Sequence, residues 1–318
     1  MTRLASGICA GAVMVAVAAA QSSAQSYKAP KTPWGDPDIQ GNYSNLTEAG
    51  TPLERPKEFE GKQLSEISAE ELRTLKRQAA ERTINNFLGP TEAPDNWWQV
   101  AYRNAENGAQ AWLVIDPPDG KIPPLTPEAQ QRQQAAAEAR KRSTRGPADS
   151  YTDRSLYDRC ISLGVPGSMT PMIYGNAYDI TQSPGYVVIR YEMIHEARVI
   201  PVDNSPHLPS TMKNYMGDAR GRWEGNTLVV ETTNFHPLIA FRGASEKLKV
   251  TERFTPVNAS TLRWEIRFDD PDTWEQSWAY AMPLKRDAEH SPYEYACHEG
   301  NRGLANILSA ARAEEKKQ

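Results

Sequence analysis

The chain has 318 residues, with 36 Lys or Arg against 40 Asp or Glu and a formal net charge of −4. The basic residues are scattered along the chain, which argues against a nucleic-acid partner. Beyond the N-terminal region no apolar run approaches the length that spans a bilayer, so we expect no integral membrane segment in the mature chain.

The N-terminus predicts export. Arg3 precedes a mostly apolar run over residues 4–20, and Ser22 and Ala24 supply the small residues of a cleavage site. This pattern is typical of a signal peptide over residues 1–24, cut near Ala24, with a membrane anchor as the alternative. We therefore expect a periplasmic or secreted protein whose roughly 290 mature residues can bury a large core.

Two cysteines, Cys160 and Cys297, remain after cleavage. An even pair in an oxidising compartment predicts a disulfide, which would close a loop of about 135 residues. The alternative is a nucleophilic or metal-binding thiol at Cys297, next to His298.

We expect residues 25–149 to form an extended arm with two helices and a short strand. The stretch 27–60 is rich in Pro, Gly and Asp, which is typical of irregular structure. Trp34 and Ile39 are its expected anchors on the domain surface. The apolar run 111–116 predicts the strand.

Both helices of this region have recognisable N-terminal caps. Ser68 and Glu71 have the spacing of a capping box, and the helical pattern runs to about Phe87. Thr126 caps the second helix, which ends near Arg142. The second helix has almost no apolar face, so we expect it to be solvated.

From about residue 150 the pattern becomes that of short strands separated by turns. The expected strands are 173–181, 186–193, 197–202, 220–223, 227–233, 247–255, 260–268 and 274–283. Because no helices alternate with them, we expect a mainly β fold. The strands would form an antiparallel meander that closes into a lipocalin-like up-and-down barrel or a curved sheet over residues 150–305. A sandwich is the alternative, and residues 306–318 are expected to be a C-terminal tail.

Charged residues alternate with apolar ones along the second and third of these strands. Arg190 and Glu192 share one face of the strand 186–193, and Arg198 follows after the turn. These side chains either line a barrel interior around a polar ligand or form cross-strand pairs, such as Glu192 with Arg198, on a solvated face. Both interpretations remain open.

His195 and Glu196 lie at the tip between these strands and are candidate catalytic residues, a general base with a charge partner. The alternative is a solvated turn. The zinc-protease motif HExxH is absent, because Val199 stands at its last position.

His207 lies in a proline-bracketed loop, and His236 ends the strand 227–235. Both are candidates for substrate binding. Together with His195 they could bind a transition metal, but their spacing does not favour a metal site.

Arg220 and Arg222 alternate on one strand and could clamp a carboxylate through bidentate hydrogen bonds; the alternative is a structural tie between loop and barrel.

The aspartates at 269 and 270 precede Pro271, where turn chemistry is favoured over acid–base roles.

Near the C-terminus, residues 293–299 alternate as in a strand, which places Glu294 and His298 on one face. If the disulfide holds this segment against the barrel, both become candidate catalytic residues.

No Walker loop, nucleophile elbow, GxGxxG or CxxCH motif is present, so we expect no cofactor.

The chain resembles a large family of exported bacterial proteins of unassigned function. The resemblance covers nearly the whole mature chain and implies one exported unit without a mechanism. It rests on Pro33–Gly41 (PWGDPDIQG), Asp116–Gly120 (DPPDG), Met216–Asp218 (MGD), Gly221–Thr232 (GRWEGNTLVVET, with Asn226 where Asp is commoner) and Tyr293–Asn301 (YEYACHEGN).

The sequence thus supports three functional hypotheses. The first is an exported, cofactor-independent enzyme that acts on a small organic molecule by acid–base chemistry as a lyase, isomerase or hydrolase. The second is a periplasmic small-molecule binding protein without turnover. The third is a metal site built from histidines. The oligomeric state is not predicted.

Overall fold

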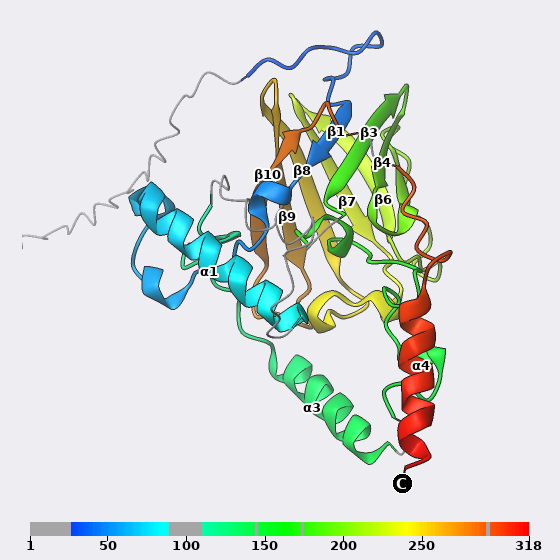
Figure 1. Cartoon of the computed structure of the whole chain (residues 1–318). Coiled ribbons are helices and arrows are strands. Elements are labelled where there is room, and N and C mark those ends of the chain that lie inside the picture. Colours follow the sequence, from blue (N-terminus) through cyan, green and yellow to red (C-terminus); the bar gives the residue numbers. More distant parts are fainter. Residues whose placement is uncertain (1–26, 89–109, 144–145, 173–174, 291–292, 318) are drawn as a thin grey trace, which may run out of the picture.

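A curved antiparallel sheet dominates the molecule (Figure 1). The computed structural model describes residues 27–88, 110–143, 146–172, 175–290 and 293–317. Their ten strands are β1 (Gly41–Ser44), β2 (Val114–Asp116), β3 (Ala177–Ser183), β4 (Tyr186–Tyr191), β5 (Ala197–Pro201), β6 (Asp218–Glu224), β7 (Thr227–Thr233), β8 (Lys249–Asn258), β9 (Thr261–Asp269) and β10 (Trp278–Arg286). The mainly β prediction is confirmed.

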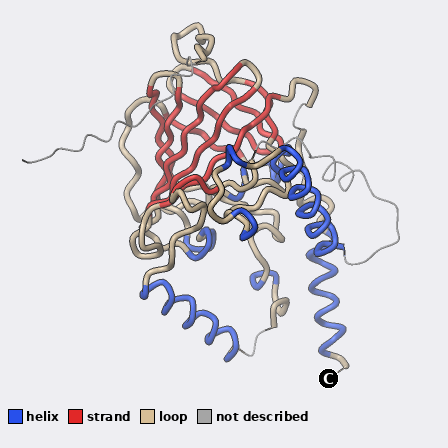
Figure 2. Tube along the Cα trace, turned by 90° about the vertical axis from the view of Figure 1, so that its left-hand side faces the viewer, coloured by secondary structure: helices blue, strands red, loops and turns tan. Residues whose placement is uncertain are grey.

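The strands run in the order β5-β4-β3-β1-β10-β9-β8-β7-β6, and β2 pairs with β10 beside this path. Two meanders, β3 to β5 and β6 to β10, are therefore joined through β1. Figure 2 shows the strands curling into a nearly closed barrel. No ladder joins β5 to β6 in the described chain, so a seam remains between these two edge strands.

Alternating residues build the barrel's interior. Along β8, Val250, Glu252 and Phe254 are buried, while the intervening residues are partly exposed. The fully buried aromatic rings include Phe268, whose centroid lies 4.4 Å from that of Trp278. Packing these large aromatic side chains together removes apolar surface from water, and this burial stabilises the barrel.

All eight strands expected after residue 150 are present, with ends that differ by a few residues, and β2 matches the short strand expected at 111–116, so only β1 is additional. β1 pairs with β3 and β10, and β2 pairs with β10. Ile39 is buried in the core as predicted, whereas Trp34 is exposed. The division into arm and barrel domains itself stays a prediction.

Three α-helices lie outside the barrel in the described chain: α1 (Ala69–Leu88), α3 (Pro127–Arg142) and α4 (Arg302–Glu315). The first two match the expected helices, and α3 buries only Ala129. Figure 1 shows α3 and α4 extending beyond one end of the barrel.

The prediction for the C-terminus is wrong in two respects. Residues 293–296 have no regular structure and residues 297–300 turn, so no strand forms there. The turn leads into α4, which occupies the expected tail, and the Asn301 side chain accepts from the Leu304 amide as its N-cap.

The expected disulfide is present between Cys160 and Cys297, with Cα atoms 5.7 Å apart. Asn301 supports it by donating to the Asp158 carbonyl at 2.8 Å. None of the described helices is long and apolar enough to cross a membrane.

Candidate functional site

A cavity of about 500 Å³ opens at one end of the barrel, and we call it the rim cavity. It is lined by segments that are far apart in the sequence: Glu48 and Gly50–Leu53, Ala79 and Arg82, Leu113, Thr170 and Pro171, Phe241 and Arg242, and Tyr280. Figure 1 shows the C-terminal end of α1 near the yellow segment that contains Phe241. The volume falls in the range of small-molecule sites.

Two arginines of the rim cavity are exposed and have no ion pair or hydrogen bond to any part of the chain that the structure describes. Arg82 lies near the end of α1, and Arg242 lies in the short 3₁₀ turn Phe241–Gly243 after β7. Some other surface arginines are paired, for example Arg253 with Glu224 at 2.9 Å, whereas exposed Arg73 and Arg77 on α1 likewise have no ion pair or hydrogen bond among the described residues. The rim cavity therefore offers two uncommitted guanidinium groups.

Arg242 also adopts a backbone conformation that is unusual for a residue with a side chain, with φ of 52°. The left-handed region costs an L-residue about 1–2 kcal/mol. Such strain concentrates at functional sites, where the position of a side chain matters more than backbone energy.

Glu48, the acidic residue of the rim cavity, is neutralised by the buried side chain of Lys76. Glu48 is buried and lies 2.8 Å from the Lys76 ammonium, which also donates to the Thr47 carbonyl at 3.2 Å and to the Thr51 hydroxyl. Burial lowers the pKa of Lys76, and Glu48 opposes that shift. Because Lys76 balances Glu48, the two rim arginines give the cavity a net positive charge.

The remaining wall combines an apolar surface with one buried hydroxyl. Leu53, Leu113 and Phe241 supply the apolar part. The Tyr280 hydroxyl makes no hydrogen bond within the described residues. Thr170 lies close enough to lower the pKa of Tyr280, but donates its own hydroxyl to the Pro166 carbonyl at 3.2 Å.

Behind Tyr280 the barrel interior holds a buried polar group of residues. Arg198 of β5 and Glu252 of β8 form an ion pair at 2.8 Å, with 3% and 0% of their side chains exposed. The Trp264 indole donates to Glu252 at 3.1 Å. Tyr178 and Tyr191 are cross-strand partners on β3 and β4, and their rings pack edge to face with centroids 6.0 Å apart. We call these five residues and Tyr280 the interior cluster.

The interior cluster keeps its tyrosines protonated. Burial raises the pKa of Tyr178, Tyr191 and Tyr280 well above the ordinary value. For Tyr191, the Arg198 guanidinium partly offsets the effect of burial on the pKa. These phenols are consequently hydrogen-bond donors at neutral pH and cannot serve as bases.

Three residues that the sequence predicted for the site do come together, in a second cavity of about 460 Å³ along the β5–β6 seam. They are Glu196, Arg198 and Arg220. Their polar groups are committed to structural contacts: Glu196 accepts from the Leu163 amide at 3.2 Å and Arg220 donates to Asp218 at 2.7 Å. The rim cavity, with its uncommitted arginines, is the stronger candidate.

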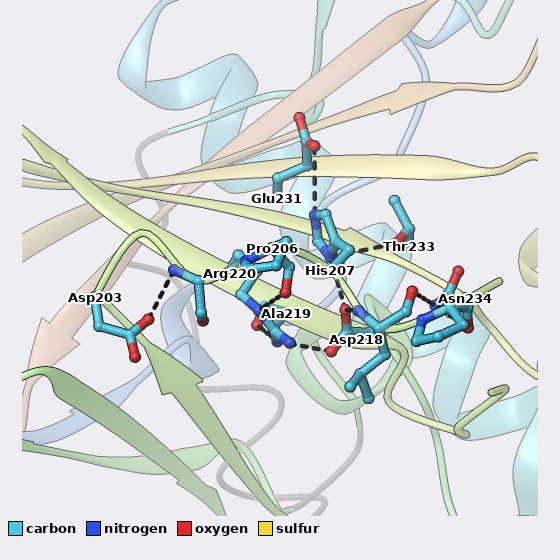
Figure 3. Close-up of polar contacts among 12 residues, drawn as sticks. Asp203, Pro206, His207, Asp218, Ala219, Arg220, Glu231, Thr233 and Asn234 are labelled. Atoms are coloured by element: carbon cyan, nitrogen blue, oxygen red, sulfur yellow. Dashed lines mark hydrogen bonds and ion pairs between the residues drawn. The ribbon is translucent and has the colours of Figure 1, made fainter.

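His207 belongs to a polar group on the outer face of β6 and β7. Its Nδ1 lies 2.8 Å from the buried Asp218 carboxylate, and its Nε2 lies 3.4 Å from Glu231. Asp218 also accepts from the Leu208 amide at 2.9 Å, and Figure 3 shows it between His207 and Arg220. Arg220 further donates to the Pro206 carbonyl at 2.9 Å, so this group ties the loop 202–217 to the barrel.

Other predicted residues form local contacts away from the rim cavity. Arg190 is on the outer face of β4, 3.4 Å from Asp179, and Arg222 pairs with Glu224 at 2.8 Å. Glu192 lies 3.3 Å from His290. Of the alternatives left open for the strands 186–193 and 197–202, Arg190 follows the solvated one and Arg198 the interior one. The expected Glu192–Arg198 pair is replaced by Arg198–Glu252.

The histidines do not converge. His236 accepts from the Leu238 amide at 3.2 Å and packs at a tilt against the Tyr215 ring, whereas His207 contacts Asp218. The His195 side chain lies outside the described residues. The described part of the chain has no group of three or more His, Cys, Asp or Glu placed to hold a metal ion.

Glu294 and His298 are exposed on the irregular C-terminal segment and line neither the rim cavity nor the seam cavity. The face they were expected to share depended on the strand that is not formed. Asp270 matches its favoured turn role, since it accepts from the Asp272 amide at 3.2 Å, and it also accepts from the distant Ser245 amide at 2.6 Å.

The main residues of the rim cavity and interior cluster were missed from the sequence. Glu252 carried a signal, because it is a charge on the apolar face of β8 between Val250 and Phe254. Arg82 and Arg242 carried none, since unpaired surface arginines look like paired ones in a sequence.

Comparisons with protein-family models, with curated proteins and with solved structures give no match. The fold and the site therefore rest on the chain's own geometry, and the resemblance drawn from its motifs stays a prediction.

Proposed function

We propose that this protein binds a small anionic organic molecule, with a carboxylate as the charged group, in the rim cavity. The observation that carries the proposal is the pair Arg82 and Arg242, two uncommitted guanidinium groups on one cavity of about 500 Å³. Guanidinium groups pair with carboxylates through two parallel hydrogen bonds.

The rest of the cavity suits the body of such a molecule. Leu53, Leu113 and Phe241 would cover an apolar chain or ring, as in small-molecule sites that combine an apolar lining with a few polar groups. Area removed from water would supply most of the affinity, and the arginines would orient the ligand.

Binding is favoured over the acid–base turnover that the sequence suggested. The titratable groups of the described cavity wall are two arginines, Glu48 held by Lys76, and Tyr280 with its raised pKa. None of these is a free base near neutral pH.

We place the activity outside the cytoplasm. The leader predicted over residues 1–24 and the Cys160–Cys297 disulfide both support export. Periplasmic and secreted locations are both compatible with these features.

Isothermal titration calorimetry with octanoate tests the proposal. We expect octanoate to bind the wild-type protein and Arg82→Gln or Arg242→Gln to weaken binding by about tenfold or more, since hydrogen bonds to charged groups contribute about 1.5–3 kcal/mol. Arg222→Gln is the matched control, because Arg222 is exposed but paired on the outer face. Equal affinity in all four proteins would refute the proposal.

A further inference from the structure

Tyr280 belongs to both the rim cavity and the interior cluster. Its side chain lines the cavity, yet it is buried to 1% exposure and its hydroxyl makes no hydrogen bond within the described residues. A buried hydroxyl without a partner costs about 1–3 kcal/mol, so a fold that keeps one at a cavity wall has a use for it.

Two other tyrosine hydroxyls of the interior cluster are buried without a hydrogen-bond partner among the described residues, as that of Tyr280 is. They belong to Tyr178 and Tyr191. Tyr280 and Glu252 each pair with Ile266 in the sheet register, so they stand on one row of the barrel, two strands apart. Tyr280 therefore connects the wall of the rim cavity to an interior region rich in hydrogen-bond donors.

The charge of that region indicates what it can recognise. Arg198 is balanced by Glu252 at 2.8 Å, and the second oxygen of Glu252 accepts from Trp264. A second anion at this end would be repelled by Glu252 once Arg198 is engaged. An uncharged oxygen would accept from the phenols without such repulsion.

We propose that the ligand carries an uncharged hydroxyl or carbonyl oxygen at the end opposite its carboxylate, and that the Tyr280 hydroxyl donates to this oxygen. This inference rests on the proposed function, because it assumes that the carboxylate lies at Arg82 and Arg242. The ligand class is thus an oxygenated carboxylic acid with an apolar middle.

The test compares pairs of probes by calorimetry: linear carboxylates, octanoate among them, and their terminal hydroxy derivatives, at several chain lengths. The proteins are the wild type, Tyr280→Phe, Arg82→Gln and the control Tyr186→Phe. Tyr280→Phe removes one oxygen and keeps the ring packing, whereas Tyr186 is exposed on β4 away from both cavities.

At the chain length that spans the cavity, we expect the hydroxy acid to bind the wild type about threefold to tenfold more tightly than the plain acid, the value of one hydrogen bond. This preference should disappear in Tyr280→Phe and persist in Tyr186→Phe. Arg82→Gln should weaken both probes alike.

Two results would overturn the inference. If plain and hydroxylated acids bind equally at every length, or if Tyr280→Phe keeps the preference, the interior hydroxyls serve ordered water and not the ligand. In either case a loss of affinity in Arg82→Gln would leave the proposed function standing. Absence of binding by every probe would overturn both.

Discussion

Arg198 and Glu252 form an ion pair across the barrel interior, at 2.8 Å, that links the edge strand β5 to β8, the third strand from the opposite edge. β5 has no ladder to β6, the neighbour that would close the barrel in the described chain. Backbone hydrogen bonds are therefore missing between β5 and β6. The ion pair to β8 fastens β5 to the rest of the barrel in their place.

Breaking this pair should destabilise the protein strongly. Arg198→Met leaves the Glu252 carboxylate buried without its counterion, and we expect the free energy of unfolding in urea to fall by about 3–5 kcal/mol. Adding Glu252→Leu should restore most of the loss. Arg253→Met is the matched control on the outer face of β8, with an expected cost below about 1 kcal/mol. Equal costs for the two arginines would contradict the role given to the buried pair.

Stability should fall steeply in alkali. The folded-state pKa of Tyr178, Tyr191 and Tyr280 is raised, so above pH about 10 the unfolded chain loses protons that the folded chain keeps. The stabilisation is complete below the unfolded pKa and is lost as pH rises past it, by about 1.4 kcal/mol per pH unit for each tyrosine. Urea unfolding from pH 8 to 11 measures the slope. Tyr191→Phe should reduce it and Tyr186→Phe should not; an unchanged slope in Tyr191→Phe would argue against the raised pKa.

Arg242→Gly should stabilise the fold and weaken ligand binding. Glycine accepts the φ of 52° without the steric cost that arginine bears, so we expect the free energy of unfolding to rise by up to about 1 kcal/mol. Affinity for octanoate should fall about tenfold, because a guanidinium is lost. A thermal melt and a titration of the same sample provide both values. A destabilised variant with unchanged affinity would refute the view that strain is retained for ligand binding.

Removing the disulfide should cost stability without changing ligand affinity. The cysteines are 137 residues apart, and a native disulfide that closes a loop of such length contributes about 2–5 kcal/mol. The double substitution of Cys160 and Cys297 by Ser should lower the free energy of unfolding in urea by that amount. Octanoate should still bind well below the melting temperature, since neither cysteine lines the rim cavity. Loss of binding in the folded variant would place part of the site at the C-terminal segment.

Much of the fold follows from local patterns in the sequence. Ser68 and Glu71 form the predicted capping box, with the Ser68 amide donating to Glu71 at 2.9 Å and the Glu71 amide donating to Ser68 at 3.2 Å. The Gly225–Asn226 turn between β6 and β7 is likewise local. β1 was missed because Gly41–Ser44 has one buried residue, and its strand pairing depends on β3 and β10.

The site was predicted poorly for a physical reason. The rim cavity depends on α1, the turn at Arg242 and β10, which come together only when the barrel forms. Glu294 and His298 were selected from an alternating pattern, but the disulfide and the turn before α4 control that segment. Arg198 is buried on the apolar face of β5, a position that the local alternation of the strand indicates, and its role in substrate binding stays a prediction.

The most direct test of the account is a crystal structure of the mature protein with octanoate bound. We predict the carboxylate within hydrogen-bond distance of Arg82 and Arg242, with the chain along Leu53, Leu113 and Phe241 and its end toward Tyr280. Octanoate outside the rim cavity, or bound there with its methyl end at the arginines, would contradict the account.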